Sequence, residues 1–141
     1  MLVSRRSRYG VQAALDLAEH GGAAPVSIKE IASRQGLPEA YLEQLMGPLR
    51  KMGIVQSSRG PQGGYTLSTS PEDVSVADIV RALDGEAWAA ECPCGGTDAN
   101  CLDHTLWHRV ADAFTASLER ETLASLLAER RDLAERPLYQ I

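Results

Sequence analysis

The sequence predicts a mostly α-helical protein with a small β-hairpin wing, that is, a winged helix-turn-helix followed by a long C-terminal helix. Three observations lead to this fold class. Residues that start and stop helices divide the N-terminal half into short amphipathic segments. Two β-prone runs around a Gly-Pro-Gln-Gly turn come next, and apolar residues then recur at helical spacing from 106 to 118. At 141 residues, the chain has the length of one ordinary domain with an appended helix or two.

The first three helices are marked by the residues at their ends. Residues 4–22 form an expected helix that stops at a Gly-Gly pair, and residues 27–36 start with a capping box and stop at a glycine. The third helix is expected to begin at Pro38, because proline is favoured at the first helical position. It carries leucine and methionine at i, i+3 and i+4 spacing as far as Met52. The second and third helices, joined by a tight turn, form a helix-turn-helix pattern.

In a helix-turn-helix, the N-terminal end of the second of the two helices is the part that makes contacts. Here this is the N-terminal end of the third helix. Five side chains there are expected to be exposed: Glu39, Ala40, Tyr41, Glu43 and Gln44. Strands are expected at Ile54–Ser57 and Tyr65–Ser68. At the tip between them, Arg59 supplies charge, and Gly63 and Gly64 permit close approach of the backbone. Such a tip suits the negative potential of a DNA minor groove, so the order of elements indicates a winged helix that binds DNA.

The charge of the chain is divided unevenly. Residues 1–66 carry eight Lys and Arg against five Asp and Glu, a net charge of +3, whereas residues 67–141 carry six against fourteen, a net charge of −8. Only the N-terminal half is therefore suited to a polyanion. No stretch approaches the ~18 uninterrupted apolar residues of a membrane span, and the N-terminus lacks the apolar core of a signal peptide. A cytoplasmic protein with no membrane contact is expected.

Four stretches, "RYGVQAALDLA", "VSIKEIASRQGLPEAYLEQLMGPLRKMGIV", "SSRGPQGGYTLS" and "VSVADIVRALDG", resemble the Rrf2 family of bacterial winged-helix transcription regulators. The tail "CLDHTLWHRV" is most similar to the iron–sulfur cluster regulators of that family, the IscR type. The resemblance implies a homodimer in which helix Pro38–Lys51 enters the major groove and the wing Ser58–Tyr65 touches the DNA backbone and minor groove. The candidate DNA-binding residues are Arg5, Glu39, Ala40, Tyr41, Glu43, Gln44, Arg50, Ser58, Arg59, Gly60, Gly63, Gly64 and Tyr65.

All three cysteines of the chain lie within the ten residues "CPCGGTDANC". An odd number of cysteines so close together does not suit a disulfide framework. Thiolates are soft donors that bind iron–sulfur clusters, zinc or copper(I), and an imidazole can fill a fourth position on iron or zinc. A four-donor set with the spacing C-x-C-x6-C-x2-H follows: Cys92, Cys94, Cys101 and His104. The resemblance implies that this set holds a 2Fe–2S cluster.

The donor set departs from the family pattern in two places. The cysteines of the family are usually more widely spaced than Cys92 and Cys94. Other family members use an acidic ligand from the first helix where this sequence has Arg8, which cannot ligate a metal. His104 is therefore the expected fourth donor, with His108 one helical turn later as a substitute. A zinc ion, or a thiol switch with no metal, stays open as the alternative.

The chain is expected to divide into a winged-helix DNA-binding domain at 1–85, a cysteine-bearing cluster loop at 86–103, and a dimerisation helix with a tail at 104–141. Leucine, valine and phenylalanine at i, i+4 intervals give the last part a broad apolar face, which favours pairing with a second copy of the chain.

The expected function is a dimeric DNA-binding transcription regulator that senses redox, iron or nitric oxide state. No enzyme is expected, because no acid or oxyanion arrangement accompanies the cysteines and histidine. A zinc-stabilised protein-interaction domain that does not bind DNA is the other class left open.

Overall fold

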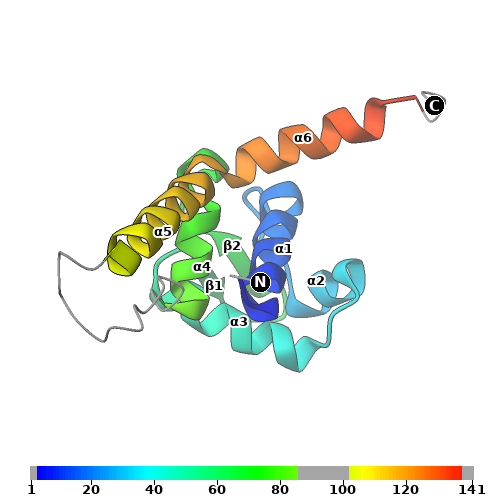
Figure 1. Cartoon of the computed structure of the whole chain (residues 1–141). Coiled ribbons are helices and arrows are strands. Elements are labelled where there is room, and N and C mark those ends of the chain that lie inside the picture. Colours follow the sequence, from blue (N-terminus) through cyan, green and yellow to red (C-terminus); the bar gives the residue numbers. More distant parts are fainter. Residues whose placement is uncertain (1–2, 86–101, 138–141) are drawn as a thin grey trace.

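The structure is a computed structural model that describes residues 3–85 and 102–137. It has the predicted fold class, mostly helical with one two-stranded antiparallel hairpin. Figure 1 shows α1 and α4 in the centre, α3 below them, α5 beside α4, and α6 extending past the end of α1. The elements in chain order are α1 (Arg5–His20), α2 (Ile28–Gln35), α3 (Glu39–Lys51), β1 (Val55–Ser58), β2 (Gly64–Leu67), the 3-10 turn η1 (Pro71–Asp73), α4 (Val76–Asp84), α5 (Leu102–Arg120) and α6 (Leu123–Glu135).

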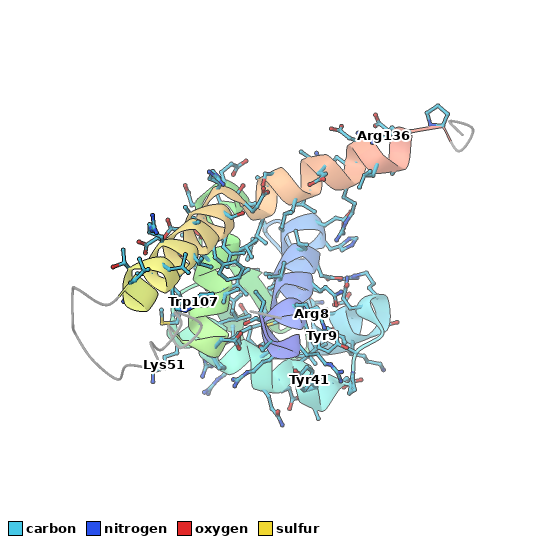
Figure 2. All side chains as sticks on the ribbon, viewed as in Figure 1. Arg8, Tyr9, Tyr41, Lys51, Trp107 and Arg136 are labelled. Carbon is cyan, nitrogen blue, oxygen red and sulfur yellow. The ribbon has the colours of Figure 1, made fainter. Side chains whose placement is uncertain are left out.

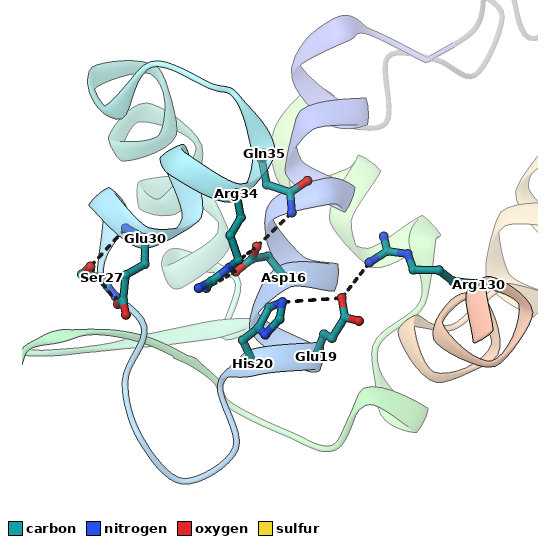
Figure 3. Close-up of polar contacts among 8 residues, drawn as sticks. All are labelled: Asp16, Glu19, His20, Ser27, Glu30, Arg34, Gln35 and Arg130. Atoms are coloured by element: carbon teal, nitrogen blue, oxygen red, sulfur yellow. Dashed lines mark hydrogen bonds and ion pairs between the residues drawn. The ribbon is translucent and has the colours of Figure 1, made fainter. Parts of the chain in front are cut away.

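The predicted helix ends are confirmed for α1 and α2, and the start of α3 is corrected by one residue. The side chains of Ser27 and Glu30 form the expected capping box, drawn in Figure 3. Gly36 ends α2 in the left-handed conformation with a φ of 65°. Pro38 is the N-cap of α3 and not its first helical residue. Its backbone is extended with a ψ of 135°, but its carbonyl already accepts the first helical hydrogen bond, from the N–H of Leu42 at 3.1 Å.

The wing is a hairpin whose strands are shifted by one residue from the expected ones, with Val55 opposite Leu67 and Ser58 opposite Gly64. A third segment joins it. Val26 and Tyr65 exchange two backbone hydrogen bonds, at 2.9 and 2.8 Å. The wing is therefore tied by its backbone to the residue just before the helix-turn-helix, so the wing and the helix-turn-helix hold a fixed relation.

A single hydrophobic core is formed by helices α1, α2, α3 and α4, strand β1 and the start of α6. Its largest fully buried apolar side chains are Leu17, Ile31, Leu42, Leu45, Met46, Leu49, Val55, Ile79, Val80 and Leu123. Helices α1 and α4 pack so closely that a Cβ on Gly10 would overlap the end of the Leu83 side chain. Burial of these apolar side chains is the main source of stability in a domain of this size.

A buried ion pair joins α1 to α2. The side chain of Asp16 is fully buried, and it accepts hydrogen bonds from Arg34, at 2.7 Å for the shortest, and from Gln35 at 2.9 Å (Figure 3). Burial raises the pKa of Asp16, but the hydrogen bonds from Arg34 and Gln35 together outweigh burial and hold that pKa below its ordinary value. The carboxylate is therefore charged at neutral pH and fixes the angle between the two helices.

The long C-terminal helix expected after the cysteines is α5, which begins at Leu102. Its last turn is held to α4 by an ion pair between Arg81 and Glu119, with 2.5 Å between the nitrogen and the oxygen. Thr122 caps α6, and an isolated bridge pairs it with Ser75, the cap of α4. Among the described helices, none is long and apolar enough to cross a membrane.

Candidate nucleic-acid interface

The third helix, α3, has one buried face and one exposed face. Leu42, Leu45, Met46 and Leu49 are fully buried against the core, at the spacing that the sequence predicts. This burial turns the opposite side of the helix outward, because residues three and four apart share a face. The predicted contact residues on the outward side are exposed: Glu39, Ala40, Glu43, Gln44 and Arg50.

Tyr41 differs from the expectation that its side chain is exposed. It is half-buried, and its ring meets the ring of Tyr9 edge to face, with 5.7 Å between the centroids and 90° between the planes. Figure 2 shows the two tyrosines together where the start of α1 lies beside α3. Position 41 borders the buried face, so α1 covers part of it. The pair anchors the start of α3 to α1, because edge-to-face aromatic contacts are favourable.

The C-terminal end of α3 is tied to the hairpin. The guanidinium of Arg50 donates a hydrogen bond of 3.3 Å to the hydroxyl of Ser57 in β1. Lys51, which follows, is exposed at the same end of the helix. The C-terminal end of α3 therefore presents two exposed cations beside the hairpin.

The tip of the wing is an exposed turn. Ser58, Arg59 and Gly60 are all exposed, and the N–H of Gly63 closes the turn by donating to the carbonyl of Gly60 at 2.9 Å. Gly60 has a φ of 109°, a conformation that favours glycine. Arg59 is therefore presented to solvent on a constrained loop, as a minor-groove contact requires.

Packing within the protein explains why glycine stands at positions 63 and 64 and tyrosine at position 65. A Cβ on Gly63 would overlap the Ser58 carbonyl oxygen, and a Cβ on Gly64 would overlap the carbonyl of Val26. Tyr65 is half-buried, forms the backbone bridge to Val26 and packs against the core. The close approach that these glycines permit is thus made by the protein's own backbone, whereas the sequence alone suggested DNA.

Gly64→Ala is expected to destabilise the protein by about 1–3 kcal/mol, because the added methyl meets backbone atoms that cannot rotate away. The control is Gln62→Ala, at an exposed position of the same turn, which should change the free energy of unfolding by less than about 0.5 kcal/mol. Urea unfolding midpoints measure both changes, and a midpoint of Gly64→Ala as high as that of Gln62→Ala would contradict the packing described for the wing.

Exposed cations lie on each of the elements just described. On α1, α3 and the wing, six of them form no ion pair with any residue in 3–85 or 102–137: Arg5, Arg6, Arg8, Arg50, Lys51 and Arg59. Arg34 is the exception on the helix-turn-helix, since Asp16 neutralises it. These cations can approach phosphates without first breaking an ion pair. Arg6 and Lys51 were not among the residues predicted from the sequence. The basic run "SRRSR" and the position of Lys51 next to Arg50 could have indicated them.

The predicted metal ligands are only partly within reach of the structure. Cys92, Cys94 and Cys101 lie outside the described residues, and His104 lies in the first turn of α5 without a described side chain. His108 is exposed one turn further along. Elsewhere in the described part of the chain, no three His, Cys, Asp or Glu side chains gather in a way that would hold a metal ion.

A profile of the Rrf2 family, described as iron-dependent transcriptional regulators, matches residues 3–129. The chain belongs to the Rrf2 family. The protein rrf2 of Nitratidesulfovibrio vulgaris Hildenborough is 44% identical to it over 133 residues, which cover 92% of this chain and 89% of that protein. The HTH-type transcriptional regulator IscR of Pectobacterium carotovorum is 40% identical over 142 residues, covering 96% of this chain and 86% of the relative.

Solved structures of Rrf2 proteins have the same fold. IscR of T. potens superposes with a TM-score of 0.80 at 42% identity, covering 97% of this chain and 93% of that one. CymR of B. subtilis, the global cysteine regulator, superposes with a TM-score of 0.75 at 37% identity, covering 90% and 96%. The oxidised form of CymR from Staphylococcus aureus gives 0.70 at 39% identity, covering 89% and 95%. This Rrf2 protein is therefore a DNA-binding transcription regulator of the IscR type, as the resemblance implied.

Proposed function

We propose that this regulator is a cytoplasmic homodimer that binds a promoter operator in double-stranded DNA. Its DNA affinity depends on a 2Fe–2S cluster held by Cys92, Cys94, Cys101 and His104. The observation that carries the DNA part is the exposed polar face of α3 beside unpaired cations on the wing and on the first turn of α1. A helix with buried leucines behind and polar side chains in front has the shape and the donors to read a major groove.

The two parts of the interface have different tasks. In the major groove, Gln44 can bond to an adenine edge, and Glu39 and Glu43 can accept from cytosine. Arg59, at the constrained wing tip, would enter a minor groove, where the negative potential attracts arginine. Arg5 and Arg50 would contact phosphates, which position the protein and carry no sequence information.

Arg59→Ala should weaken binding to operator and unrelated DNA alike and make the salt dependence less steep by about one unit, because a charge is lost. Gln44→Ala should instead reduce discrimination between sites by about 1–3 kcal/mol. Fluorescence anisotropy with both duplexes over a range of salt concentrations measures both effects. A loss confined to the operator for Arg59→Ala, or an equal loss on all DNA for Gln44→Ala, would reverse these assignments.

The dimer is proposed to form through α5. Four apolar side chains on this helix are exposed: Leu102 at 78% and Leu106, Trp107 and Val110 at 42% each. An apolar row on a helix of 19 residues favours a second copy of the same helix. The pairing would set the separation of two recognition helices, which must match half-sites about one DNA turn, ~34 Å, apart.

Val110→Glu is expected to convert the dimer to a monomer, because a carboxylate would be buried without a partner in the interface. Light scattering measures the molecular mass of the variant. Asp112→Ser, on the same helix, is the control and should leave the mass unchanged. A Val110→Glu variant that stays dimeric would place the interface elsewhere.

The cofactor proposal rests on the chemistry of the donor set. Three thiolates and one imidazole fit a 2Fe–2S cluster, and the family description names iron. When bound, such a cluster would supply one-electron redox chemistry and make the protein sensitive to oxidants, iron supply or nitric oxide. Protein purified without air should then be red-brown and contain about two iron and two sulfide per chain. Removal of the cluster should change the affinity for the operator.

A thiol switch is the second candidate. It is favoured by the structural similarity to CymR, one of whose structures is an oxidised form, and by the three cysteines within ten residues. A colourless protein without iron, whose DNA affinity responds to oxidant, would establish it. A colourless protein that contains one zinc per chain would establish the zinc alternative.

A further inference from the structure

The N-terminal end of α1 is fastened to the C-terminal end of α4 by one carboxylate. The hydroxyl of Ser4 donates a hydrogen bond of 2.6 Å to one oxygen of Asp84, and the N–H of Ser4 donates one of 3.2 Å to the other. The same Ser4 oxygen accepts from the N–H of Ser7 at 3.0 Å and so caps α1. One side chain therefore joins a cap and a tertiary contact between residues 80 positions apart, and we refer to this arrangement as the Ser4–Asp84 clasp.

The clasp is a charge-assisted contact. Burial raises the pKa of Asp84, but the hydrogen bonds that it accepts and the nearby charge of Arg6 hold that pKa below its ordinary value. Hydrogen bonds to an ionised acceptor are about twice as strong as neutral ones. Behind the clasp, Gly10 lets α1 approach Leu83 so closely that no larger residue would fit without a shift. The first turn of α1 is thus fixed on α4.

That first turn carries three exposed arginines, Arg5, Arg6 and Arg8. One residue later, Tyr9 touches Tyr41 at the start of α3, so the basic turn lies at the end of α1 that adjoins the recognition helix (Figure 2). A first helical turn frays unless its cap and contacts hold it, and a frayed turn would have to be ordered again on binding.

From this geometry we infer that Asp84 is a positioning residue for DNA binding: through Ser4 it holds the basic first turn of α1 in place to contact phosphates beside the recognition helix. The inference rests on the proposed DNA contact of that turn. Under this inference the negatively charged Asp84 favours binding to DNA, whereas its charge alone would repel the phosphates.

Asp84→Ala provides the test because the two views predict opposite signs. Loss of a negative charge should by itself strengthen DNA binding. Loss of the clasp should weaken binding roughly three- to tenfold and make its salt dependence less steep by about one unit, since the arginines are no longer held. Asp73→Ala, which removes an exposed carboxylate from η1, is the charge-matched control and should leave affinity unchanged or slightly raised. The measurement is anisotropy of a labelled mixed-sequence duplex with the full chain.

Ser4→Asn serves as the conservative variant, because asparagine caps helices well and its amide can still donate to Asp84. It should keep both affinity and salt slope, whereas Ser4→Ala should behave like Asp84→Ala. Wild-type or stronger binding by Asp84→Ala, together with weakened binding by Arg59→Ala in the same assay, would overturn the inference and leave the DNA interface intact. If Arg59→Ala also bound like wild type, the proposed interface itself would be wrong and the inference would fall with it.

Discussion

Replacing Cys101 by alanine is expected to abolish the 2Fe–2S cluster, leaving protein purified without air colourless and free of stoichiometric iron. The reason is the type of donor that is lost. Without Cys101, one iron would lose an anionic thiolate, a stronger donor than a neutral imidazole, and would have to recruit water in its place. The same outcome is expected for Cys92→Ala and Cys94→Ala. Anaerobic visible spectra with iron and sulfide analysis of each variant measure it.

His104→Ala should be milder and leave a labile cluster with a shifted spectrum, and His104→Cys should restore stability, because all-thiolate ligation is the commoner arrangement. His108→Ala is the matched control, one turn along α5, and should keep full iron content. A full-strength cluster in Cys92→Ala or Cys94→Ala would show that the four-ligand assignment is wrong, since these two are the closely spaced pair. It would leave the membership of the Rrf2 family untouched.

Arg34→Met is expected to lower the free energy of unfolding by about 3 kcal/mol at neutral pH, because it leaves the charge of Asp16 buried with only Gln35 as a partner. Methionine keeps most of the volume of the side chain, so lost packing contributes little. Urea denaturation at fixed protein concentration measures the change. Arg130→Met is the control. Its ion pair with Glu19 has both side chains 40–46% exposed, and pairs of this kind contribute about 0–1 kcal/mol.

The pH dependence of the free energy of unfolding, compared between the wild type and Arg34→Met, tests the same explanation. In the wild type, the pKa of Asp16 is lower when folded than when unfolded, so its contribution is complete above about pH 4 and is lost as the pH falls through the folded pKa. In Arg34→Met, burial is opposed only by Gln35, so the folded pKa should rise and protonation should relieve the penalty. The difference in stability between the two proteins should therefore shrink on acidification. A difference independent of pH would show that charge burial is not its cause.

Local chemistry explains which parts of the fold could be predicted from the sequence. Ser27 and Glu30, three residues apart, satisfy each other's backbone groups, and the signal is complete within one turn. Gly36 likewise ends α2 by its own conformational freedom. The start of α3 was placed one residue early because proline is acceptable both as the N-cap and at the next position, and the flanking sequence does not separate the two.

The contacts that could not be predicted join residues far apart in the chain. Nothing near Asp16 marks it as the buried carboxylate, because its partner Arg34 lies in another helix. The half-burial of Tyr41 depends on how α1 lies on α3, which no local pattern encodes. For the same reason, no local pattern reveals that the carbonyl of Val26 lies against Gly64, because the two become neighbours only in the folded protein.

The junction between α5 and α6 has a mechanical consequence for the regulator. The backbone at residues 121–123 is hydrogen-bonded to the start of α4. The N–H of Val76 donates to the carbonyl of Glu121 at 2.8 Å, and the N–H of Leu123 donates to the carbonyl of Val74 at 3.0 Å. From this junction to Leu102, α5 has 19 residues and is about 28 Å long. A rotation of about 10° there displaces the far end, at Leu102, by about 5 Å, close to the rise of one helical turn. A small change where the helix is anchored is thus multiplied at the end that adjoins the cysteines.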